Sequence, residues 1–406
     1  MTTQKFDIII VGGGAAGFFS AINIAEKNPK LSVAILERGS ELLGKVKISG
    51  GGRCNVTHAC FEPSELVKYY PRGEKELRGP FQQFNPTHTI EWFKNHGVNL
   101  KTEADGRMFP VSNTSQTIID CFLHFAQKLR IQVITLQSVQ NIQKKETEWQ
   151  LTTPNQQFIC EKLIITTGSN PKMWEMMQSL GHKIIEPVPS LFTFSVEKKN
   201  SITELSGISS AVSLQVAQTK LQTEGNLLIT HKGFSGPAVL KLSAWGAPIL
   251  ANKNYQFQLK INWLTHEVNL NQALEAIQKL KTNLLKKNIG TQPPFGFPQR
   301  LWDYFLQTAQ INPEKKWADI SKKEIQLLAE VLTQNTHNIT SKNTFKEEFV
   351  TAGGIDLKEV NFKTMQSKIH NSLYFAGETL NIDAVTGGFN FQNAWTTGYI
   401  LAQNIS

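Results

Sequence analysis

The strongest constraint on the fold is a set of three glycines, Gly12, Gly14 and Gly17, in the spacing G-x-G-x-x-G. Residues 6–11 precede them as a continuous apolar run, which is typical of a parallel strand buried on both faces. Residues 15–27 follow with apolar side chains at helical spacing. We therefore predict a strand, a tight turn and a helix of an α/β fold, with the turn suited to a dinucleotide. A glycine-rich turn in an ordinary α/β protein is the alternative.

An acidic residue also stands where a dinucleotide turn needs one. The apolar run 31–36 is the next predicted strand, and Glu37 lies at its end, 20 residues after Gly17. In such a βαβ unit the first glycine permits the turn and the second lets a pyrophosphate approach the backbone. The third lets helix and strand pack closely, and the phosphates face the helix amino terminus. Glu37 would accept hydrogen bonds from the adenosine ribose hydroxyls.

A second glycine-rich segment, residues 44–55 with the sequence GKVKISGGGRCN, is also basic. Its glycines allow close approach to a pyrophosphate or a flavin, and Lys45 or Arg53 could offset phosphate charge. A solvated basic loop is the alternative, because charge runs are usually surface features. Cys54 invites a redox interpretation, but it has no partner at C-x-x-C spacing, so packing is its default role.

A third segment near the carboxyl terminus repeats the pattern of strand, glycine and helix. Residues 373–376 predict a short buried strand that ends at Gly377 and Glu378, and Asp383 follows. The glycine turn in 386–392, TGGFNFQ, leads into a helix. A strand end could supply an acid for ribitol hydroxyls, and the helix amino terminus could face the N1 and O2 edge of a flavin. A terminal helix with a glycine cap is the alternative.

Two weaker features complete the set of candidates. The apolar run 163–168 ends in Thr167 and Gly168, a turn that we expect to close over the cofactor, with an ordinary strand turn as the alternative. His231 is a candidate for proton transfer, although such a histidine is more often structural. We expect no metal site and no nucleophilic triad, because neither spacing occurs.

Composition narrows the class of protein. The chain has 406 residues, enough for two or three compact units, and a formal charge of +9, which attracts anions without naming one. Its four cysteines contain no C-x-x-C pair and fit a reducing compartment. The first residues predict a strand rather than a signal peptide, and no window is long and apolar enough to span a membrane. We therefore expect a cytoplasmic protein without a membrane partner.

The residue pattern changes near Pro187, where short strand-like runs separated by Ser, Gly and Asn begin. We predict an inserted substrate domain over 188–345, β-rich first and helical afterwards. The flanking segments, 1–187 and 346–406, would form one domain together, because the last segment returns to strand, glycine turn and helix.

Six segments resemble the signature sequences of the BaiN/YhiN-like NAD(P)/FAD-dependent oxidoreductases, also described as aminoacetone oxidase-like flavoproteins. They are GGGAAG, KISGGGRCNVTH, GRMFPVS, THKGFSGPAVL, TAGGI and LYFAGETLNIDAVTGGFNFQNAW, and the match extends from residue 6 to about residue 402. The resemblance implies an α/β, Rossmann-like FAD-binding domain formed from both ends of the chain, with an inserted β-barrel-like and helical region. Asn381 and Phe389 depart from it, since we expect an acid and a tyrosine there.

The residues above, together with those that the resemblance adds, form the candidate FAD site. It comprises Gly12, Gly14, Ala16, Gly17, Glu37, Arg38, Lys45, Ser49, Gly50, Gly51, Arg53, Asn55, Val139, Thr167, Gly168, Gly377, Glu378, Asp383, Gly388, Phe389 and Asn390.

These observations predict an FAD-dependent oxidoreductase that exchanges a hydride or an electron pair with a small organic substrate. The catalytic residues stay open, with His231 and Cys54 as weak candidates. NAD(P)H as electron donor also stays open, because no second G-x-G-x-x-G occurs and a transient contact needs none. One alternative is a flavin-binding sensor or a nucleotide- or RNA-associated protein without turnover. Another is a flavin-dependent RNA-modifying enzyme. Nucleic acid is not the expected partner, because the sequence has no aromatic-interleaved basic patch.

Overall fold

The computed structural model describes residues 2–198, 200–343 and 350–405. The chain folds into two compact units. Unit 1 comprises Met1–Pro189 and Glu347–Ser406, and unit 2 comprises Ser190–Lys346. Each unit has a sheet architecture of its own.

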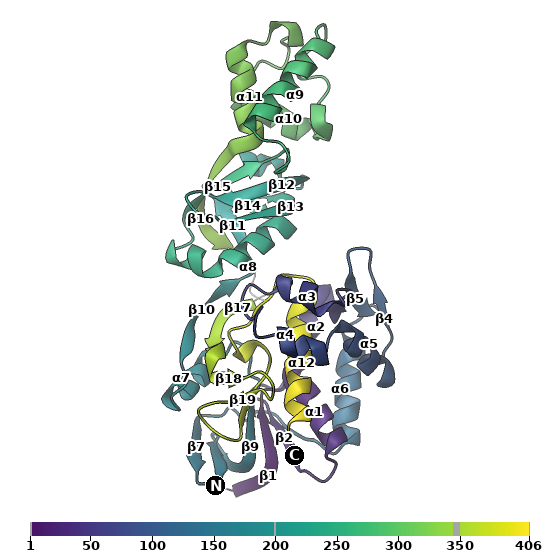
Figure 1. The fold of residues 1–406 in the computed structure, drawn as a ribbon, viewed down its shortest axis with the longest axis vertical. Helices are drawn as coiled ribbons and strands as arrows, with labels where there is room; N and C mark the ends of the chain where they lie inside the picture. The colour runs from purple at the N-terminus through teal and green to yellow at the C-terminus, as the bar shows by residue number, and fades with distance from the viewer. Residues whose placement is uncertain (1, 199, 344–349, 406) are drawn as a thin grey trace. The chain divides into compact units, whose positions relative to one another are not determined.

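Unit 1 is built on a mixed sheet with a parallel centre (Figure 1). Its strand order is β18-β19-β20-β9-β1-β2-β6, and the five strands from β20 to β6 are parallel. The apolar run of β1 pairs with β2 on one side and β9 on the other, and Ile8, Ile9 and Ile10 are fully buried. Such a strand needs apolar residues on both faces. The strands are β1 (Thr2–Val11), β2 (Val33–Leu36), β6 (Gln132–Ile134), β9 (Gln156–Ile165), β18 (Val360–Asn361), β19 (Gln366–Ser367) and β20 (Leu373–Phe375).

The two ends of the chain meet in unit 1 through helices α1 (Ala15–Lys27) and α12 (Phe389–Gln403) (Figure 1). A Cβ atom at Gly398 would lie 2.9 Å from the Ser20 Oγ and 3.4 Å from the Ala16 carbonyl oxygen, so glycine lets the helices pack closely. The Phe19 and Trp395 rings pack 5.2 Å apart at the same contact. The predicted Rossmann-like α/β fold is confirmed.

The remaining elements of unit 1 are helices, two more strands of the main sheet (β7 and β8), and two smaller sheets, β3-β5-β4 and β10-β17. The helices are α2 (Gly44–Gly52), α3 (Pro63–Leu66), α4 (Arg78–Gln83), α5 (Pro86–Asn95), α6 (Gln116–Lys128) and α7 (Pro171–Ser179). The strands are β3 (Thr57–His58), β4 (Leu100–Thr102), β5 (Arg107–Pro110), β7 (Asn141–Lys145), β8 (Glu148–Thr152), β10 (Ile184–Ser190) and β17 (Val350–Ile355).

Unit 2 contains a closed six-stranded barrel in the order β11-β14-β13-β12-β15-β16, which confirms the β-barrel-like region. Its apolar interior includes Phe194, Leu214, Leu227 and Ile261, all nearly or fully buried. The strands are β11 (Thr193–Val196), β12 (Ser209–Val216), β13 (Gln222–Thr230), β14 (Gly233–Ser235), β15 (Phe257–Asn262) and β16 (Asn335–Asn343).

The predicted order of elements in unit 2, with all strands before the helices, is wrong. Helix α8 (Pro237–Asn252) interrupts the strands, and β16 follows the helices α9 (Leu270–Asn283), α10 (Gln299–Thr308) and α11 (Lys322–Gln334). Strand β16 closes the barrel between β11 and β15, so helices α9, α10 and α11 are inserted in the chain between two barrel strands, β15 and β16. The sequence of β16, NTHNITSKN, is polar and lacks the apolar run by which the other strands were predicted.

Within the described residues, no helix combines the length and hydropathy that crossing a bilayer requires. The same residues contain no group of three or more His, Cys, Asp or Glu side chains placed to hold a metal ion.

Candidate functional site: a glycine cradle in unit 1

The first glycine turn lies between β1 and α1 and is tightly packed. Gly12 has a φ of +116°, and a Cβ atom there would lie 2.6 Å from the carbonyl oxygen of Thr166. A Cβ atom at Gly17 would overlap the carbonyl oxygen of Gly12. The hydroxyl of Thr166 donates to the carbonyl oxygens of Val11 and Gly12, 3.1 and 3.0 Å away. The turn therefore needs glycine at both positions, because no side chain fits there.

The middle glycine differs from its neighbours. A Cβ atom at Gly14, the N-cap of α1, would have nothing within 4 Å. Its φ of −96° is also accessible to any residue. The protein's own packing does not demand glycine at this position. Open space beside the amino terminus of α1 is what a pyrophosphate would require.

The Glu37 carboxylate holds the backbone beside this turn. One of its oxygens accepts from the amide of Gly13 at 2.8 Å, and the other accepts from the amide of Gly39 at 2.9 Å. Arg38 is exposed. The segment after β6 lies alongside, because the amide of Gln137 donates to the carbonyl oxygen of Glu37 at 2.8 Å. Val139 is buried two residues further on.

The segment 44–55 contains helix α2, whose last residues, Gly50, Gly51 and Gly52, have left-handed backbone conformations. Gly50, Gly51 and Gly52 have φ values of 57°, 69° and 81°, and Cβ atoms at the last two would have nothing within 4 Å. Ser49 turns inward, since its hydroxyl donates to the carbonyl oxygen of Val46 at 2.9 Å. The exposed glycine backbone is open to a ligand.

The cations of this segment pair with carboxylates from other parts of unit 1. Lys45 forms an ion pair with Glu378, which also accepts from the amide of Thr351 at 3.1 Å. Arg53 donates to Glu103 at 2.6 Å and lies 3.9 Å from the ring centroid of Phe109. The Lys45–Glu378 pair joins the second and third predicted segments, which are 333 residues apart.

The third segment reaches the first as well. A Cβ atom at Gly377, whose φ is +72°, would lie 2.9 Å from the Cβ of Ala16 on α1. Gly168, in the turn after β9, would place a Cβ 3.4 Å from a carboxylate oxygen of Glu378. The segments that contain Gly12, Lys45, Gly168 and Gly377 therefore converge in unit 1.

Asp383 is fully buried and is held by Arg72, which donates to both of its carboxylate oxygens. The Arg72 side chain is only 15% exposed. Our sequence interpretation gave Asp383 a role toward ribitol hydroxyls and did not include Arg72. In the structure this carboxylate already has a cationic partner within the protein.

The glycine turn before α12 is packed against β3. With its carboxamide oriented so that both ends are satisfied, Asn55 accepts from the amide of Gly388 at 2.9 Å and donates to the carbonyl oxygen of Thr57 at 3.0 Å. Asn390 clamps the preceding loop, since its side chain both accepts from the amide of Ala384 at 3.0 Å and donates to that residue's carbonyl at 3.1 Å. These contacts fix the start of α12.

Phe389 belongs to an aromatic cluster that the sequence did not reveal. Its buried ring stacks on Tyr69 at 4.2 Å and on His58 at 4.6 Å between ring centroids. Burial lowers the pKa of His58. Tyr70 donates to the Phe389 carbonyl oxygen at 2.6 Å. In the sequence, the only signal for this cluster is that His58 and Tyr69 follow the glycine-rich segment 44–55.

Several polar atoms around the turns are buried without a hydrogen-bond partner in the described part of the chain. They include the Thr167 Oγ1, the Asn381 Oδ1 and the His58 Nδ1. Buried polar groups are normally satisfied, so orphan atoms beside open glycine backbone fit a site for a polar ligand. The residues present are therefore compatible with a dinucleotide such as FAD.

The weak catalytic candidates differ in their surroundings. Cys54 is fully buried, and burial raises the pKa of its thiol to about 12, so it stays protonated near neutral pH. His231 is exposed in unit 2, in the turn between β13 and β14. The Cys54 thiol forms a side-chain hydrogen bond with Ser49.

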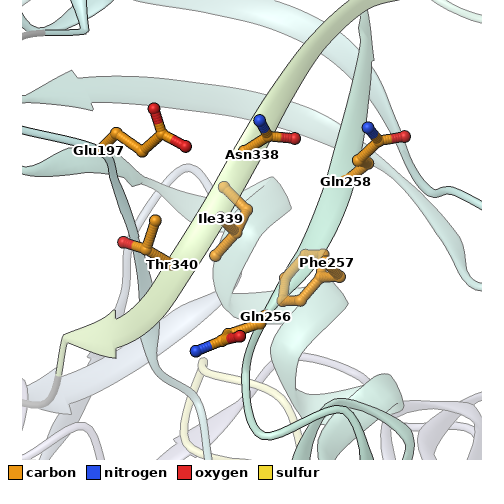
Figure 2. Close-up of a pocket in the computed structure, with 7 residues that line it drawn as sticks. All are labelled: Glu197, Gln256, Phe257, Gln258, Asn338, Ile339 and Thr340. Carbon is orange, nitrogen blue, oxygen red and sulfur yellow. The ribbon is translucent and has the colours of Figure 1, made fainter.

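A shallow pocket also lies on the barrel of unit 2 (Figure 2). Its polar lining carries amides, a hydroxyl and one carboxylate, and no cation among the described residues. The lining residues are Glu197, Gln256, Phe257, Gln258, Asn338, Ile339 and Thr340. None of them belongs to the predicted site.

The chain is similar over nearly its whole length to two proteins of known activity. Across 99% of its length it is 28% identical to the ribosomal RNA dihydrouridine synthase of Escherichia coli K12, covering 98% of that protein. It is 25% identical to the 3-dehydro-bile acid delta(4,6)-reductase of Clostridium scindens, covering 96% of this chain and 97% of the relative.

A solved structure supports the fold. The 3-ketosteroid delta1-dehydrogenase of Sterolibacterium denitrificans superposes with a TM-score of 0.51 at 10% identity, covering 98% of this chain and 99% of that one. The profile of the HI0933-like protein Rossmann domain matches residues 6–404. The chain therefore belongs to the HI0933-like family, as the sequence resemblance led us to expect.

Proposed function

We propose that the chain is an FAD-dependent oxidoreductase that reduces a carbon–carbon double bond conjugated with a carbonyl group. The observation that carries the cofactor assignment is the convergence of three glycine segments, joined by the Lys45–Glu378 pair and the packing of Gly377 on Ala16. Open backbone at Gly14 and Gly51 and the orphan hydroxyl of Thr167 leave the cradle incomplete without a polar ligand.

The proposed contacts follow from the chemistry of each part of FAD. The amino terminus of α1 beyond Gly14 would hold the pyrophosphate, with Lys45 to offset its charge. Glu37 would accept from the adenosine ribose hydroxyls in place of backbone amides. The fixed amino terminus of α12, with Gly388, would lie against the flavin edge and favour negative charge there. The other residues of the candidate FAD site would line these parts.

The reaction class comes from what the two relatives' names have in common. Dihydrouridine is uridine with its C5–C6 double bond saturated, and that bond is conjugated with the C4 carbonyl. The double bonds of a 3-oxo delta(4,6) acid are likewise conjugated with a ketone. When bound, FAD in its reduced form would supply the hydride that such a reduction places on the carbon β to the carbonyl. A solvent-derived proton would go to the α carbon, and the two electrons would come from a donor of the nicotinamide class.

Uridine in ribosomal RNA is the substrate class that we favour. The relative with the RNA substrate spans nearly the whole chain at the higher identity, and the formal charge of +9 suits a polyanion. This proposal differs from the sequence-based expectation, in which the substrate was a small organic molecule and nucleic acid was not the expected partner. A steroid-like enone is the second candidate, favoured by the similarity to the bile acid reductase.

The test is a half-reaction with the holoprotein. The bound flavin is reduced without oxygen and mixed with an unmodified large-subunit ribosomal RNA transcript or with a 3-oxo-delta(4) steroid. We expect the RNA to reoxidise the flavin and to gain two hydrogens on a uracil, as seen by mass spectrometry. Reoxidation by the steroid alone would favour the second candidate. Reoxidation by neither would leave the sensor without turnover as the better description.

A further inference from the structure

We propose that the helical end of unit 2 is an RNA-binding surface that holds the phosphate backbone on a cluster of lysines. We call this cluster the lysine ridge and define it as Lys286, Lys287, Lys315, Lys316, Lys322 and Lys323: two Lys–Lys pairs in the loops next to α9 and α11, and a third pair in the first turn of α11. The inference rests on the proposed function, because it assumes that the substrate is RNA. Figure 1 shows the three helices gathered at one end of the barrel.

The distribution of charge first points to unit 2. Residues 190–346 contain 18 Lys and Arg against 10 Asp and Glu, a formal charge of +8. The rest of the chain contains 24 against 23, a charge of +1. Unit 2, the smaller unit, therefore carries almost all of the protein's excess positive charge. A localised excess of this kind is the electrostatic footprint of a polyanion site.

Backbone pairing between two loops brings the first four lysines of the ridge together. The amide of Ile289 donates to the carbonyl oxygen of Lys315 at 2.8 Å, and the amide of Trp317 donates to that of Lys287 at 3.0 Å. Asn288 and Lys316 form an antiparallel bridge between these bonds. Two segments almost 30 residues apart thus form one short ladder.

The ladder has an inner and an outer face. Ile289 and Trp317 are buried in the core of unit 2, at 0% and 1% exposure. Because side chains alternate along paired extended segments, Lys316 and its cross-strand neighbour Asn288 lie on the opposite, outer face. Lys286 lies in the turn that precedes Asn288 and is also exposed. Burial of the ladder's inner face thus places the Lys316 side chain on the solvent side of the ladder.

The last pair stands at the start of α11, where lysine is electrostatically unfavourable. Ser321 is the N-cap, and Glu324 completes a capping box with it. Lys322 and Lys323 are the first two helical residues, and both are exposed. A helix amino terminus carries partial positive charge, so cations there weaken the helix. They also add to the positive potential, which indicates a role outside folding.

Acidic residues neutralise only part of the ridge. Lys315 pairs with Glu324 at 2.8 Å, and Glu314 accepts from the side chain of Asn288 at 3.1 Å. Asp319 is exposed nearby. The remaining ridge lysines form no ion pair in the described part of unit 2: Lys286, Lys287, Lys316, Lys322 and Lys323.

An exposed aromatic ring lies in a loop that is hydrogen-bonded to the ridge, a combination that the sequence alone did not reveal. Phe295 is 43% exposed and has a φ of +59°, a conformation that is unusual for a bulky residue. Its loop is tied to the ridge, because Lys287 donates to the side chain of Gln292 at 2.8 Å and Gln299 donates to the carbonyl oxygen of Gly290 at 2.8 Å. Lysines beside an exposed ring suit single-stranded RNA, in which a base can stack on the ring.

The barrel pocket is a poor rival for this role. Its charged side chain is the carboxylate of Glu197, and its remaining polar groups are neutral (Figure 2). A phosphate there would face a like charge without a compensating cation from the described lining.

The test uses the full chain with FAD and a fluorescent single-stranded transcript of large-subunit ribosomal RNA. The ridge variant is K286Q/K316Q/K322Q/K323Q. Its matched control, K30Q/K75Q/K94Q/K145Q, removes four exposed lysines of unit 1 that form no ion pair with any described residue. Fluorescence anisotropy gives Kd over a range of salt concentrations.

We expect the ridge variant to bind the RNA about tenfold or more weakly near 0.1 M salt, and its log–log salt slope to fall by about 3. The control should stay within about twofold. Phe295→Ala should weaken single-stranded RNA about fivefold or more while leaving duplex RNA nearly unchanged. FAD content should be the same in all variants.

Equal losses in ridge and control variants, or no loss in either, would overturn the inference. Tighter binding to phosphatidylserine vesicles than to RNA would also overturn it, because the ridge would then be a membrane surface. Failure of the proposed function looks different: RNA would bind through the ridge without reoxidising the reduced flavin.

Discussion

The two units handle their charges in opposite ways. Among the described residues, twelve of the fourteen ion pairs lie in unit 1, and only two lie in unit 2. Unit 1 is nearly neutral and uses pairs such as Lys45–Glu378 and Arg72–Asp383 to join distant segments around its glycine turns. Unit 2 carries the excess charge and leaves most of it unpaired within its described residues. Paired charge builds a site inside unit 1, whereas unpaired charge in unit 2 is available to a partner.

Substitution of the glycines of unit 1 should have the largest effect on stability and on FAD binding. In Gly17→Ala the new methyl group would overlap the Gly12 carbonyl oxygen and force the turn away from α1. We expect the loss of FAD binding and a fall in unfolding free energy at the upper end of the scale for overpacked cores, about 3 kcal/mol or more.

Gly14→Ala is the matched variant, since nothing lies within 4 Å of the added atom. It should fold normally yet bind FAD much more weakly. Denaturant unfolding and flavin absorbance measure both effects, and equal stability of the two variants would contradict the account.

The buried ion pair of unit 1 gives the next largest effect. Asp383→Asn leaves the Arg72 guanidinium buried without its counter-charge, so we expect the apoprotein to lose about 3 kcal/mol of unfolding free energy. Glu41→Gln, which breaks the exposed Lys47–Glu41 pair, should leave stability nearly unchanged. Urea titrations of both variants provide the comparison. A small loss for Asp383→Asn would show that the pair does not hold the segment in place.

Unit 2 should show its own dependence on pH. Burial lowers the pKa of His337 from its ordinary value of 6.5 to about 4. The unfolded chain therefore binds a proton that the folded chain rejects, and stability is lost as the pH falls from 6.5 toward 4, by up to about 3 kcal/mol. His337→Gln keeps a donor toward Asn335, 2.7 Å from the histidine Nε2, and should flatten this dependence. Hydrogen exchange in the barrel strands is the measurement, and an unchanged slope in the variant would contradict the assignment.

The smallest effect belongs to the ion pair at the edge of the ridge. Burial opposes ionisation of Glu324, but hydrogen bonds from Lys315 and Ser321 lower its pKa to about 2. The stabilisation is present above about pH 4.5 and is lost as the pH falls toward 2. Because both groups are partly exposed, Lys315→Gln should cost about 1 kcal/mol or less at pH 7. Thermal unfolding measures this cost, and a loss comparable with that of Asp383→Asn would erase the contrast between the units.

The sequence predicted best what depends on local pattern. The turn at Gly12, its flanking strand and helix, and the return of the carboxyl-terminal segment each have a short-range signature, and they specify the fold of unit 1. Pairing across long separations has no such signature. Arg72 and Asp383 are 311 residues apart, and strand β16 is too polar to appear as a barrel strand.

The lysine ridge was missed for the same reason. As a linear sequence its Lys–Lys pairs are ordinary solvated runs, and the first two pairs come together only through the ladder between residues 287–289 and 315–317. The exposure of Phe295 likewise depends on a left-handed backbone in a loop that carries no periodic signal.

The central claim is that segments from both ends of the chain form one FAD site in unit 1. The most direct measurement is the visible spectrum of the purified wild-type chain after incubation with FAD and removal of the unbound cofactor, beside that of Gly14→Ala. The account predicts one tightly bound FAD per wild-type chain and little or none in the folded variant. A colourless wild-type protein, or a variant that retains FAD equally well, would contradict it.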